Sequence, residues 1–357
     1  MTLLDSLGRR MLFAFDPETA HGLSIAALKS GLPVGCAPRP DPRLAVTVAG
    51  IAFPNPLGMA AGYDKNAEVP DALLGLGFGF AEVGTVTPLA QSGNPRPRMF
   101  RLTEDNAVIN RLGFNNEGHD ACEQRLRARN GKPGIVGVNI GANKDSDDRT
   151  GDYVLGISRF ARHASYLTVN ISSPNTPGLR NLQARESLAE LLSRVVAARA
   201  ETGRTVPIFL KIAPDLHEAE LEDIAAEVVE KGIEGVIVSN TTITRPRLAS
   251  RHATETGGLS GKPLFERSTA VLARMRKLVG KSCAIIGVGG VDSADTALEK
   301  IRAGADLVQL YSCMVFEGPS LPGLILRGLP KLLDREGVSS ISELRDSRLH
   351  QWAAKPL

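Results

Sequence analysis

The chain has few cysteines, and their spacing excludes the usual cysteine-based sites. Its 357 residues include four, Cys36, Cys122, Cys283 and Cys313, with no C-x-x-C pair and no cluster of histidines beside them. Structural zinc sites and disulfide frameworks need closer and more regular spacings. We therefore expect reduced thiols, as in the cytosol, and no bound metal.

Neither sign of charge is in large excess. Lys and Arg total 42, Asp and Glu total 39, the net charge is +3 and the pI is about 8.7. Proteins that bind nucleic acid usually carry a basic patch or stripe, and no long block of one sign occurs here. We therefore expect no nucleic-acid partner.

Long apolar runs are also missing. No segment approaches the roughly 18 consecutive apolar residues that cross a bilayer. The N-terminus lacks a small-residue cleavage site after its apolar part. We expect a protein that is neither exported nor membrane-spanning. The hydrophobic residues, 43% of the chain, suffice for one barrel-sized domain or two smaller ones.

Residues 1–31 are predicted to form a small unit of two helices. The apolar face of the first helix comprises Leu4, Leu7, Met11 and Phe15. Asp16 and Pro17 are typical of the cap and first turn of a second helix, which should end near Gly31. Packing on the rest of the protein and binding at a membrane interface both explain such an apolar face. Four prolines predict that residues 32–43 form a stiff, extended linker.

Apolar runs alternate with helical patterns through residues 44–335. The eight runs predicted as buried strands are Pro56–Ala61, Ala81–Val86, Ile135–Ile140, Leu167–Ile171, Ile208–Ile212, Val236–Ser239, Ala284–Val288 and Leu307–Tyr311. The clearest helical patterns are 215–231, with Asp215 as the expected cap, 263–279 and 292–303.

This alternation predicts an α/β fold, a (β/α)8 TIM barrel with a small N-terminal helical extension. A C-terminal helix and tail should follow at 336–357. The alternative is a doubly wound sheet, which is disfavoured because no G-x-G-x-x-G follows the first strand.

Polar side chains recur where the predicted strands end. They are Lys65, Thr85, Asn139, Asn170, Lys211, Ser239, Asn240 and Thr241, in strand order. A barrel core does not need such residues repeatedly at these points. They therefore indicate one shared site at the carboxyl ends of the strands.

The fourth predicted strand breaks into a polar loop at Asn170. Its candidates for chemistry are Asn170, Ser173, Asn175 and Thr176, because ligands bind at the carboxyl ends of parallel strands. An ordinary strand-to-helix loop, with Asn and Ser as turn formers, would have the same composition.

Glycines after the seventh predicted strand, at 287–290, indicate a phosphate site completed by Tyr311 and Ser312. The glycine-rich loop at 257–261 could add donors or close over the mouth. A phosphate with nearby lysines and amides indicates FMN, whose reduced ring Lys211 could stabilise. A sugar-phosphate isomerase or aldolase using Lys65 or Lys211 is the alternative, although the site has few carboxylates. Another class of function is a binding or scaffold protein with the same barrel fold, which would bind no flavin.

Four motifs together resemble the dihydroorotate dehydrogenase family of flavoenzymes. They are AAGYDK at 60–65, NRLGFNN at 110–116, NISSPNTPGLR at 170–180 and GGLSG at 257–261. The likeness covers the chain to about residue 345. Ser173 stands where the soluble class of the family has cysteine, and a helical extension precedes the barrel. The chain therefore resembles the membrane-associated, quinone-using class.

The resemblance implies oxidation of (S)-dihydroorotate to orotate in de novo UMP synthesis, with FMN as hydride acceptor and a ubiquinone-type quinone as final electron acceptor. Ser173 would remove the C5 proton while hydride passes from C6 to flavin N5, with Thr176 and Phe114 in its proton relay. Substrate contacts are implied for Lys65, Asn110, Arg111, Leu112, Gly113, Phe114, Asn170, Asn175, Asn240 and Thr241. Flavin contacts are implied for Ala61, Gly62, Tyr63, Asp64, Lys65, Thr85, Asn139, Asn170, Lys211, Ser239, Gly261, Gly290, Tyr311 and Ser312.

The resemblance also implies a quinone site. His21, Arg101 and Tyr311 match the positions expected near the quinone head, at the end of an apolar tunnel formed by residues 1–31. From the residues alone, His21 would be a helix-surface residue. The same segment is implied to contact the membrane surface, as part of a peripheral protein on the cytoplasmic face of the inner (cell) membrane. Tyr63 stands where related chains commonly carry Leu or Phe.

Overall fold

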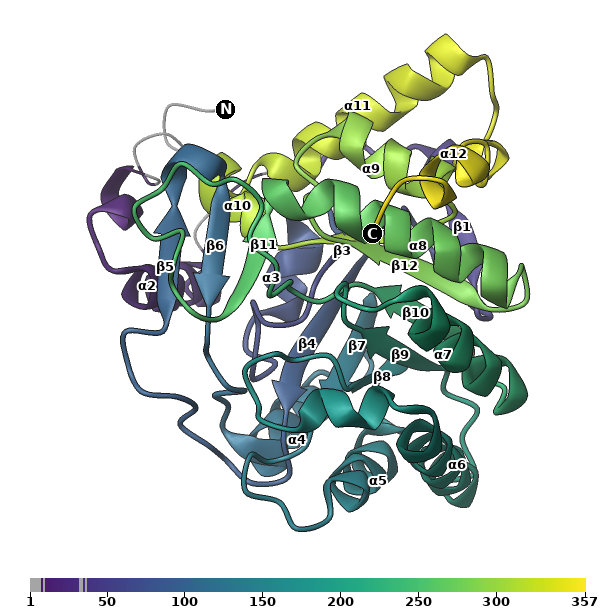
Figure 1. Cartoon of the computed structure of the whole chain (residues 1–357). Helices are drawn as coiled ribbons and strands as arrows, with labels where there is room; N and C mark the ends of the chain where they lie inside the picture. Colours follow the sequence, from purple (N-terminus) through teal and green to yellow (C-terminus); the bar gives the residue numbers. More distant parts are fainter. Residues whose placement is uncertain (1–7, 9, 32–34, 36) are drawn as a thin grey trace.

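The computed structural model, shown in Figure 1, describes residues 8, 10–31, 35 and 37–357. Eight parallel strands close into one barrel, in the order β10-β12-β13-β3-β4-β7-β8-β9. Their bounds are β3 Leu57–Met59, β4 Phe80–Val86, β7 Ile135–Ile140, β8 Tyr166–Asn170, β9 Ile208–Ile212, β10 Gly235–Val238, β12 Ala284–Val288 and β13 Leu307–Leu310. Each strand overlaps one of the eight predicted runs, so the predicted (β/α)8 barrel is confirmed.

Helices pack around this wall (Figure 1). Their bounds are α3 Pro70–Gly75, α4 Gly118–Ala128, α5 Arg149–Phe160, α6 Arg185–Glu201, α7 Glu218–Glu230, α8 Phe265–Val279, α9 Ala294–Arg302, α10 Ser312–Glu317, α11 Leu321–Glu336 and α12 Leu349–Ala353. Asp215 is not the cap of α7, contrary to the prediction. Its carboxylate instead accepts hydrogen bonds from Arg180 and from the N–H of Ile243, and the helix starts three residues later.

The barrel interior is filled at the amino ends of the strands by aromatic rings packed edge-on or tilted against one another. Phe80, Tyr166 and Phe209 come from three strands, with ring centroids 6.2 Å and 5.0 Å apart along the series. Gly137 leaves room for them, since a Cβ there would lie 2.1 Å from the Tyr166 ring. Burial of each such side chain contributes about 1.5–3 kcal/mol. Because this end is packed, the carboxyl ends of the strands are left for a site.

Five further strands of the described residues lie outside the barrel. β1 (Val46–Val48) and β2 (Ile51–Phe53) pair as an antiparallel hairpin, whose Phe53 packs 5.1 Å from Phe80. The others form a small antiparallel sheet of β5 (Met99–Leu102), β6 (Ala107–Asn110) and β11 (Gly258–Gly261). Residues 257–261 were predicted as a loop but are largely a strand. Glycine has a low strand propensity, and hydrogen bonds to β6 stabilise the strand here.

Helix α2 (Pro17–Lys29) lies beside this small sheet (Figure 1). Asp16 caps it, because its carboxylate accepts hydrogen bonds from the N–H groups of Glu18 and Thr19, both at 3.1 Å. Most of the predicted first helix, including Leu4 and Leu7, lies outside the described residues. None of the helices in the described part of the chain is long and apolar enough to cross a membrane.

Glu18 and Lys29 fasten α2 to the rest of the protein through ion pairs, and Glu18 also pairs with the exposed Arg96 at 3.0 Å. Glu18 accepts hydrogen bonds from Arg98 Nη2 at 2.6 Å and Arg98 Nε at 3.0 Å. Lys29, in the last turn, donates to Glu68 at 2.7 Å. The pair of Glu18 with Arg98 is largely buried and that of Lys29 is exposed. Glu18 is therefore the stronger anchor.

The described parts of the two segments that flank the barrel contain short helices. Pro42, at the end of the predicted extended linker, begins a 3-10 helix whose cap is Asp41. Trp352, in α12, is buried, packs edge-on against Phe265 of α8, and donates its indole N–H to Glu299 at 2.8 Å. The tail after residue 336 thus packs on the barrel helices.

Candidate active site

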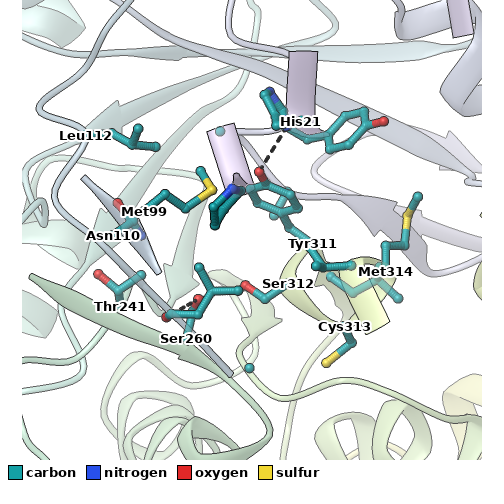
Figure 2. Close-up of a pocket in the computed structure, with 18 of the residues that line it drawn as sticks. His21, Met99, Asn110, Leu112, Thr241, Ser260, Tyr311, Ser312, Cys313 and Met314 are labelled. Carbon is teal, nitrogen blue, oxygen red and sulfur yellow. Dashed lines mark hydrogen bonds between the residues drawn. The ribbon is translucent and has the colours of Figure 1, made fainter. Parts of the chain in front are cut away.

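One cavity of about 690 Å³ extends from helix α2 to the carboxyl ends of the barrel strands. Beside α2 it is lined by apolar side chains such as Met11, Leu12 and Leu28. At the strand ends its lining includes Ser173 and Lys211. Figure 2 shows part of this cavity. Its two ends therefore differ in polarity, as a site for one apolar and one polar ligand would.

A chain of buried polar side chains runs inside the barrel towards this cavity. Asn139 donates to the fully buried Glu82 at 2.7 Å, and Thr85 donates to Asn139 at 2.6 Å. Asn170 donates from Nδ2 to both Thr85 and Asn139 at 3.0 Å. These bonds fix the orientation of the Asn170 amide. Glu82 was not among the predicted site residues, although a single carboxylate within an otherwise apolar strand was a usable signal.

Ser172 connects the ends of strands β8 and β10. Its hydroxyl donates to Asn170 Oδ1 at 2.8 Å and accepts from Asn240 Nδ2 at 3.0 Å. Asn240 Oδ1 in turn accepts the N–H of Thr241 at 2.8 Å. Two predicted substrate residues, Asn170 and Asn240, are thus held by one serine that the prediction omitted.

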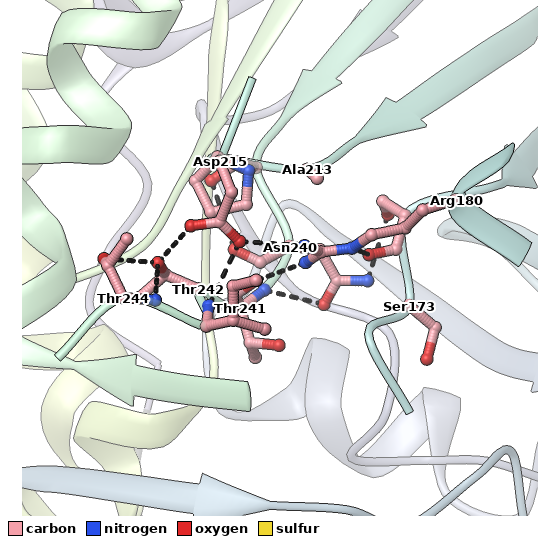
Figure 3. A network of polar contacts seen from close by, with 12 residues as sticks. Ser173, Arg180, Ala213, Asp215, Asn240, Thr241, Thr242 and Thr244 are labelled. Atoms are coloured by element: carbon pink, nitrogen blue, oxygen red, sulfur yellow. Dashed lines mark hydrogen bonds and ion pairs between the residues drawn. The ribbon is translucent and has the colours of Figure 1, made fainter. Parts of the chain in front are cut away.

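Arg180 holds the loops of these strands together, as Figure 3 shows. Its guanidinium donates to the carbonyl oxygens of Ser172 at 3.1 Å and Thr241 at 3.2 Å. It also pairs with Asp215 at 2.9 Å, and Asp215 accepts from the hydroxyl of Thr242. One cation therefore positions the loop after β8 against the loop after β10.

Ser173 lies in this loop with its side chain at the cavity wall. The residue is 5% exposed, and its Oγ accepts the N–H of Asn175 at 3.3 Å. The Asn175 amide lies 3.4 Å from Asn110 Oδ1, which brings the end of β6 to the same place. Within the described residues the Ser173 O–H donates to no acceptor. The hydroxyl is therefore free to interact with a ligand.

Thr176 and Phe114, the two residues predicted to relay the proton of Ser173, lie in different surroundings. Thr176 is buried and its Oγ1 has no hydrogen-bond partner among the described residues. Phe114 lines the cavity in a left-handed backbone conformation, with φ of 54°. No described hydrogen bond joins Thr176 to Ser173. An unpaired buried hydroxyl carries a free-energy cost, and the described residues leave that of Thr176 unsatisfied.

Two lysines bring positive charge to the cavity. Lys211 is 5% exposed and forms no hydrogen bond or ion pair with the part of the chain described, and burial lowers its pKa. Lys65 Nζ lies 3.3 Å from His21 Nε2, and burial lowers the Lys65 pKa to about 8. Both can therefore meet an anionic or polar ligand as desolvated cations.

The glycine loop after β12 forms a cradle. Gly289 and Gly290 have φ values of 109° and 72° and line the cavity. A Cβ on Gly290 would lie 2.5 Å from Phe265 Cβ, so only glycine fits there. Their two N–H groups bond to no other described residue. Free backbone donors in a glycine loop suit a phosphate. Ser312, whose hydroxyl donates to that of Ser260 at 2.7 Å (Figure 2), lines the same cavity, as does Ser260.

At the α2 end, His21 lies among three side chains of the barrel. Tyr311 OH lies 3.3 Å from His21 Nδ1, as Figure 2 shows. The Tyr63 ring lies 5.2 Å from the His21 ring, edge-on. Burial and the charge of Lys65 lower the His21 pKa to about 3, so this imidazole is neutral at ordinary pH. His21 is thus part of the cavity wall and not a free helix-surface residue.

Several predicted site residues do not line the cavity. Asp64 accepts hydrogen bonds from the N–H groups of Glu68 and Val69, both at 2.8 Å, and so shapes the loop after β3. Arg111 pairs with Glu255 at 2.8 Å. The others outside the lining are Asn139 and Thr176. These four residues are therefore not part of the cavity wall.

The remaining predicted residues lie around the cavity. Those lining it are Ala61, Gly62, Tyr63, Lys65, Thr85, Asn110, Leu112, Gly113, Phe114, Asn170, Ser173, Asn175, Lys211, Ser239, Asn240, Thr241, Gly261, Gly290, Tyr311 and Ser312, with His21 and Arg101. Arg101 donates to the carbonyl oxygens of Leu12 and Phe15, and its guanidinium lies 4.7 Å from the centre of the Phe13 ring. It therefore ties the N-terminal segment to β5.

Comparison with known proteins gives one consistent family. The model of the family described as dihydroorotate dehydrogenase matches residues 43–333. The chain is 74% identical over 358 residues to dihydroorotate dehydrogenase (quinone) of Mesorhizobium japonicum, which covers 100% of both chains. It is 71% identical over 354 residues to that of Rhizobium leguminosarum bv. trifolii, which covers 98% of each. The structure resembles that of DHODH from Eimeria tenella in complex with ferulenol, with a TM-score of 0.89, 40% identity, and coverage of 93% of this chain and 95% of that one.

Proposed function

The chain belongs to the dihydroorotate dehydrogenase family and to its quinone-dependent class of pyrimidine-biosynthesis oxidoreductases, and we propose how its cavity serves both half-reactions. (S)-Dihydroorotate is oxidised to orotate at the barrel mouth, and a ubiquinone-type quinone accepts the electrons beside α2. The observation that carries this assignment is the single cavity, which Ser173 and Lys211 line at one end and His21 and Tyr311 at the other. One cofactor between these ends can serve both.

FMN is the proposed cofactor, and when bound it supplies the hydride acceptor. The residues present fit it. The free N–H groups of Gly289 and Gly290 suit its phosphate, and Asn170 and Thr85, which line the cavity within a hydrogen-bonded network, would lie at the polar edge of its ring. Lys211 would stabilise the negative charge of the reduced ring, since no described residue otherwise satisfies its ammonium.

At the substrate end, Ser173 is the proposed base for the C5 proton. A free serine is a weak base, so its own proton must pass to a second group. The unpaired hydroxyl of Thr176 supports a role in that relay, beside Phe114. Lys65 and the amides of Asn110, Asn175 and Asn240 would orient the planar, anionic substrate.

At the quinone end, the hydrogen-bond directions follow from donor and acceptor chemistry. An ammonium has no lone pair, so Lys65 donates to His21 Nε2. The proton of the neutral imidazole is then on Nδ1 and is donated to the Tyr311 oxygen. Tyr311 keeps its own O–H for a ligand in the cavity. This supports its proposed contact with a quinone carbonyl, with Arg101 nearer the cavity entrance.

Exposed apolar side chains support a peripheral contact with the membrane. Met11, Phe15 and Leu23 are 62%, 46% and 42% exposed, although all three border the cavity. Such residues beside an apolar opening suit the headgroup boundary of a bilayer. We assign residues 1–31 to this contact, on the cytoplasmic face of the inner (cell) membrane, where a quinone could enter directly.

An anaerobic two-step titration tests the whole proposal. Dihydroorotate should bleach the yellow flavin, and a ubiquinone analogue should then restore the colour. Purified protein that never takes up flavin would overturn the cofactor assignment and favour a scaffold or an isomerase. Bleaching without recolouring would leave the substrate end intact and refute the quinone end.

A further inference from the structure

Lys300 is a fully buried lysine that neither half-reaction uses. It lies on α9 and is 0% exposed. Its ammonium donates to Ser268 Oγ at 2.6 Å and to the Val288 carbonyl at 3.4 Å, and lies 5.1 Å from the centre of the Phe265 ring. No carboxylate of the described residues forms an ion pair with it. Burial lowers the pKa of Lys300 well below its usual value, and an anion bound nearby would favour the charged form of the side chain.

The groups that hold this ammonium also support the glycine loop. Val288 ends β12 and directly precedes Gly289. Ser268 Oγ lies 3.3 Å from the Gly289 carbonyl, and a Cβ on Gly289 would lie 2.8 Å from that hydroxyl. Phe265, whose ring faces the ammonium, is the residue against which Gly290 packs. Lys300 therefore lies directly behind the loop of Gly289 and Gly290, which lines the cavity.

We propose that Lys300 is a positioning residue whose buried charge holds the phosphate of FMN on the Gly289–Gly290 loop. The inference rests on the proposed FMN site. The loop supplies directed N–H donors, and Lys300 supplies charge behind them without touching the ligand. A phosphate monoester carries nearly two negative charges at neutral pH. Attraction between such charges is strong where protein, not water, lies between them.

The decisive comparison uses two ligands that differ only in the phosphate. Full-length protein freed of flavin is titrated with FMN and with riboflavin, and quenching of flavin fluorescence gives both Kd values. Lys300→Met should weaken FMN binding by about tenfold or more and riboflavin binding by less than about threefold. Lys277→Met removes an exposed charge from α8 and is the matched control, with neither Kd changed more than about twofold.

The outcomes separate this inference from the proposed function. Equal weakening of FMN and riboflavin by Lys300→Met would mean that Lys300 only supports packing, and would overturn the inference. Unmodified protein that binds both ligands equally would overturn the phosphate site itself. If the unmodified protein binds FMN more tightly than riboflavin and Lys300→Met keeps the same preference, only the proposed role of Lys300 is refuted.

Ser268→Ala tests the same arrangement if Lys300→Met does not fold. This change removes the hydroxyl that holds the ammonium behind the loop. It should weaken FMN binding by about threefold to tenfold and leave riboflavin binding unchanged. An unchanged ratio of the two Kd values in this variant would also refute the proposal.

Discussion

His21 Nε2 lies 3.3 Å from Lys65 Nζ, so a side chain of the N-terminal helix contacts a lysine at the mouth of the barrel. The two residues are far apart in the sequence and belong to the two proposed half-sites. Lys65 is proposed to orient the substrate. It also begins the series of hydrogen bonds that passes through His21 to Tyr311. The two ends of the cavity are therefore coupled through side chains of the protein itself.

Replacement of Ser173 by alanine should slow flavin reduction by dihydroorotate by about 10²- to 10⁴-fold, because the proposed base is lost. The flavin spectrum should stay normal. Stopped-flow bleaching under anaerobic conditions measures the rate. Ser172→Ala is the control, since that hydroxyl only orients Asn170 and Asn240, and it should cost less than about tenfold. Near-normal turnover of Ser173→Ala at neutral pH would refute the base assignment.

The pKa of Lys65 leads us to expect that orotate binding depends on pH. This pKa is lowered to about 8 by burial in the folded protein, so the positive charge is present below that pH and lost above it. The Kd of orotate should therefore rise by about tenfold per pH unit above pH 8. Lys65→Met should bind orotate weakly, and its Kd for orotate should not rise in this way above pH 8. A constant Kd up to pH 10 in the unmodified protein would contradict the role of the charge.

Replacement of His21 by leucine should slow flavin reoxidation by a quinone about tenfold or more. Loss of the imidazole leaves the Tyr311 hydroxyl without its orienting donor. Flavin reduction by dihydroorotate should change less than about threefold. Ser24→Ala, on the same helix, removes a hydroxyl that contacts Tyr63 and is the control for helix packing. Equal slowing of both half-reactions by His21→Leu would show that the residue is not specific to the quinone end.

Replacement of Glu18 by alanine should loosen helix α2. Its loss leaves the buried Arg98 without a carboxylate, at a cost of about 2–4 kcal/mol in the free energy of docking the helix. Amide hydrogen exchange of residues 17–29 measures the effect. Glu68→Ala removes the exposed pair with Lys29 and should cost at most about 1 kcal/mol. Equal exchange in the two variants would contradict the assigned difference between the anchors.

The Glu18 anchor also has a pH signature. Hydrogen bonds from Arg98 lower the pKa of Glu18 below its usual value. The stabilisation is then present above the unfolded pKa, about 4.5, and is lost as the pH falls through the lower folded pKa. In the unmodified protein, exchange of α2 should rise below about pH 4. Exchange that is already fast at pH 6 would contradict this anchor.

Much of the fold could be predicted because its signals are local. Each barrel strand is a short apolar run between turn residues, and the polar residues at the ends of these runs all belong to one side of a parallel barrel. The sheet of β5, β6 and β11 could not be predicted in the same way. Gly258–Gly261 has no strand pattern of its own and becomes a strand only through pairing with β6.

The contacts that set the chemistry depend on partners that are distant in the chain. Asp215 had the right position to cap a helix, but Arg180 binds it instead. Glu82 and Lys300 are charged residues within otherwise apolar patterns, and only the structure shows what each contacts.

The sequence by itself therefore determined the eight-stranded barrel, the polar mouth and the motifs of the family, because burial periodicity and turn chemistry act over a few residues. Only the tertiary structure decided that Ser173 and His21 line the same cavity and which side chains are desolvated. Desolvation and hydrogen-bond partners change pKa values and bond directions, and they arise only when distant segments of the chain meet.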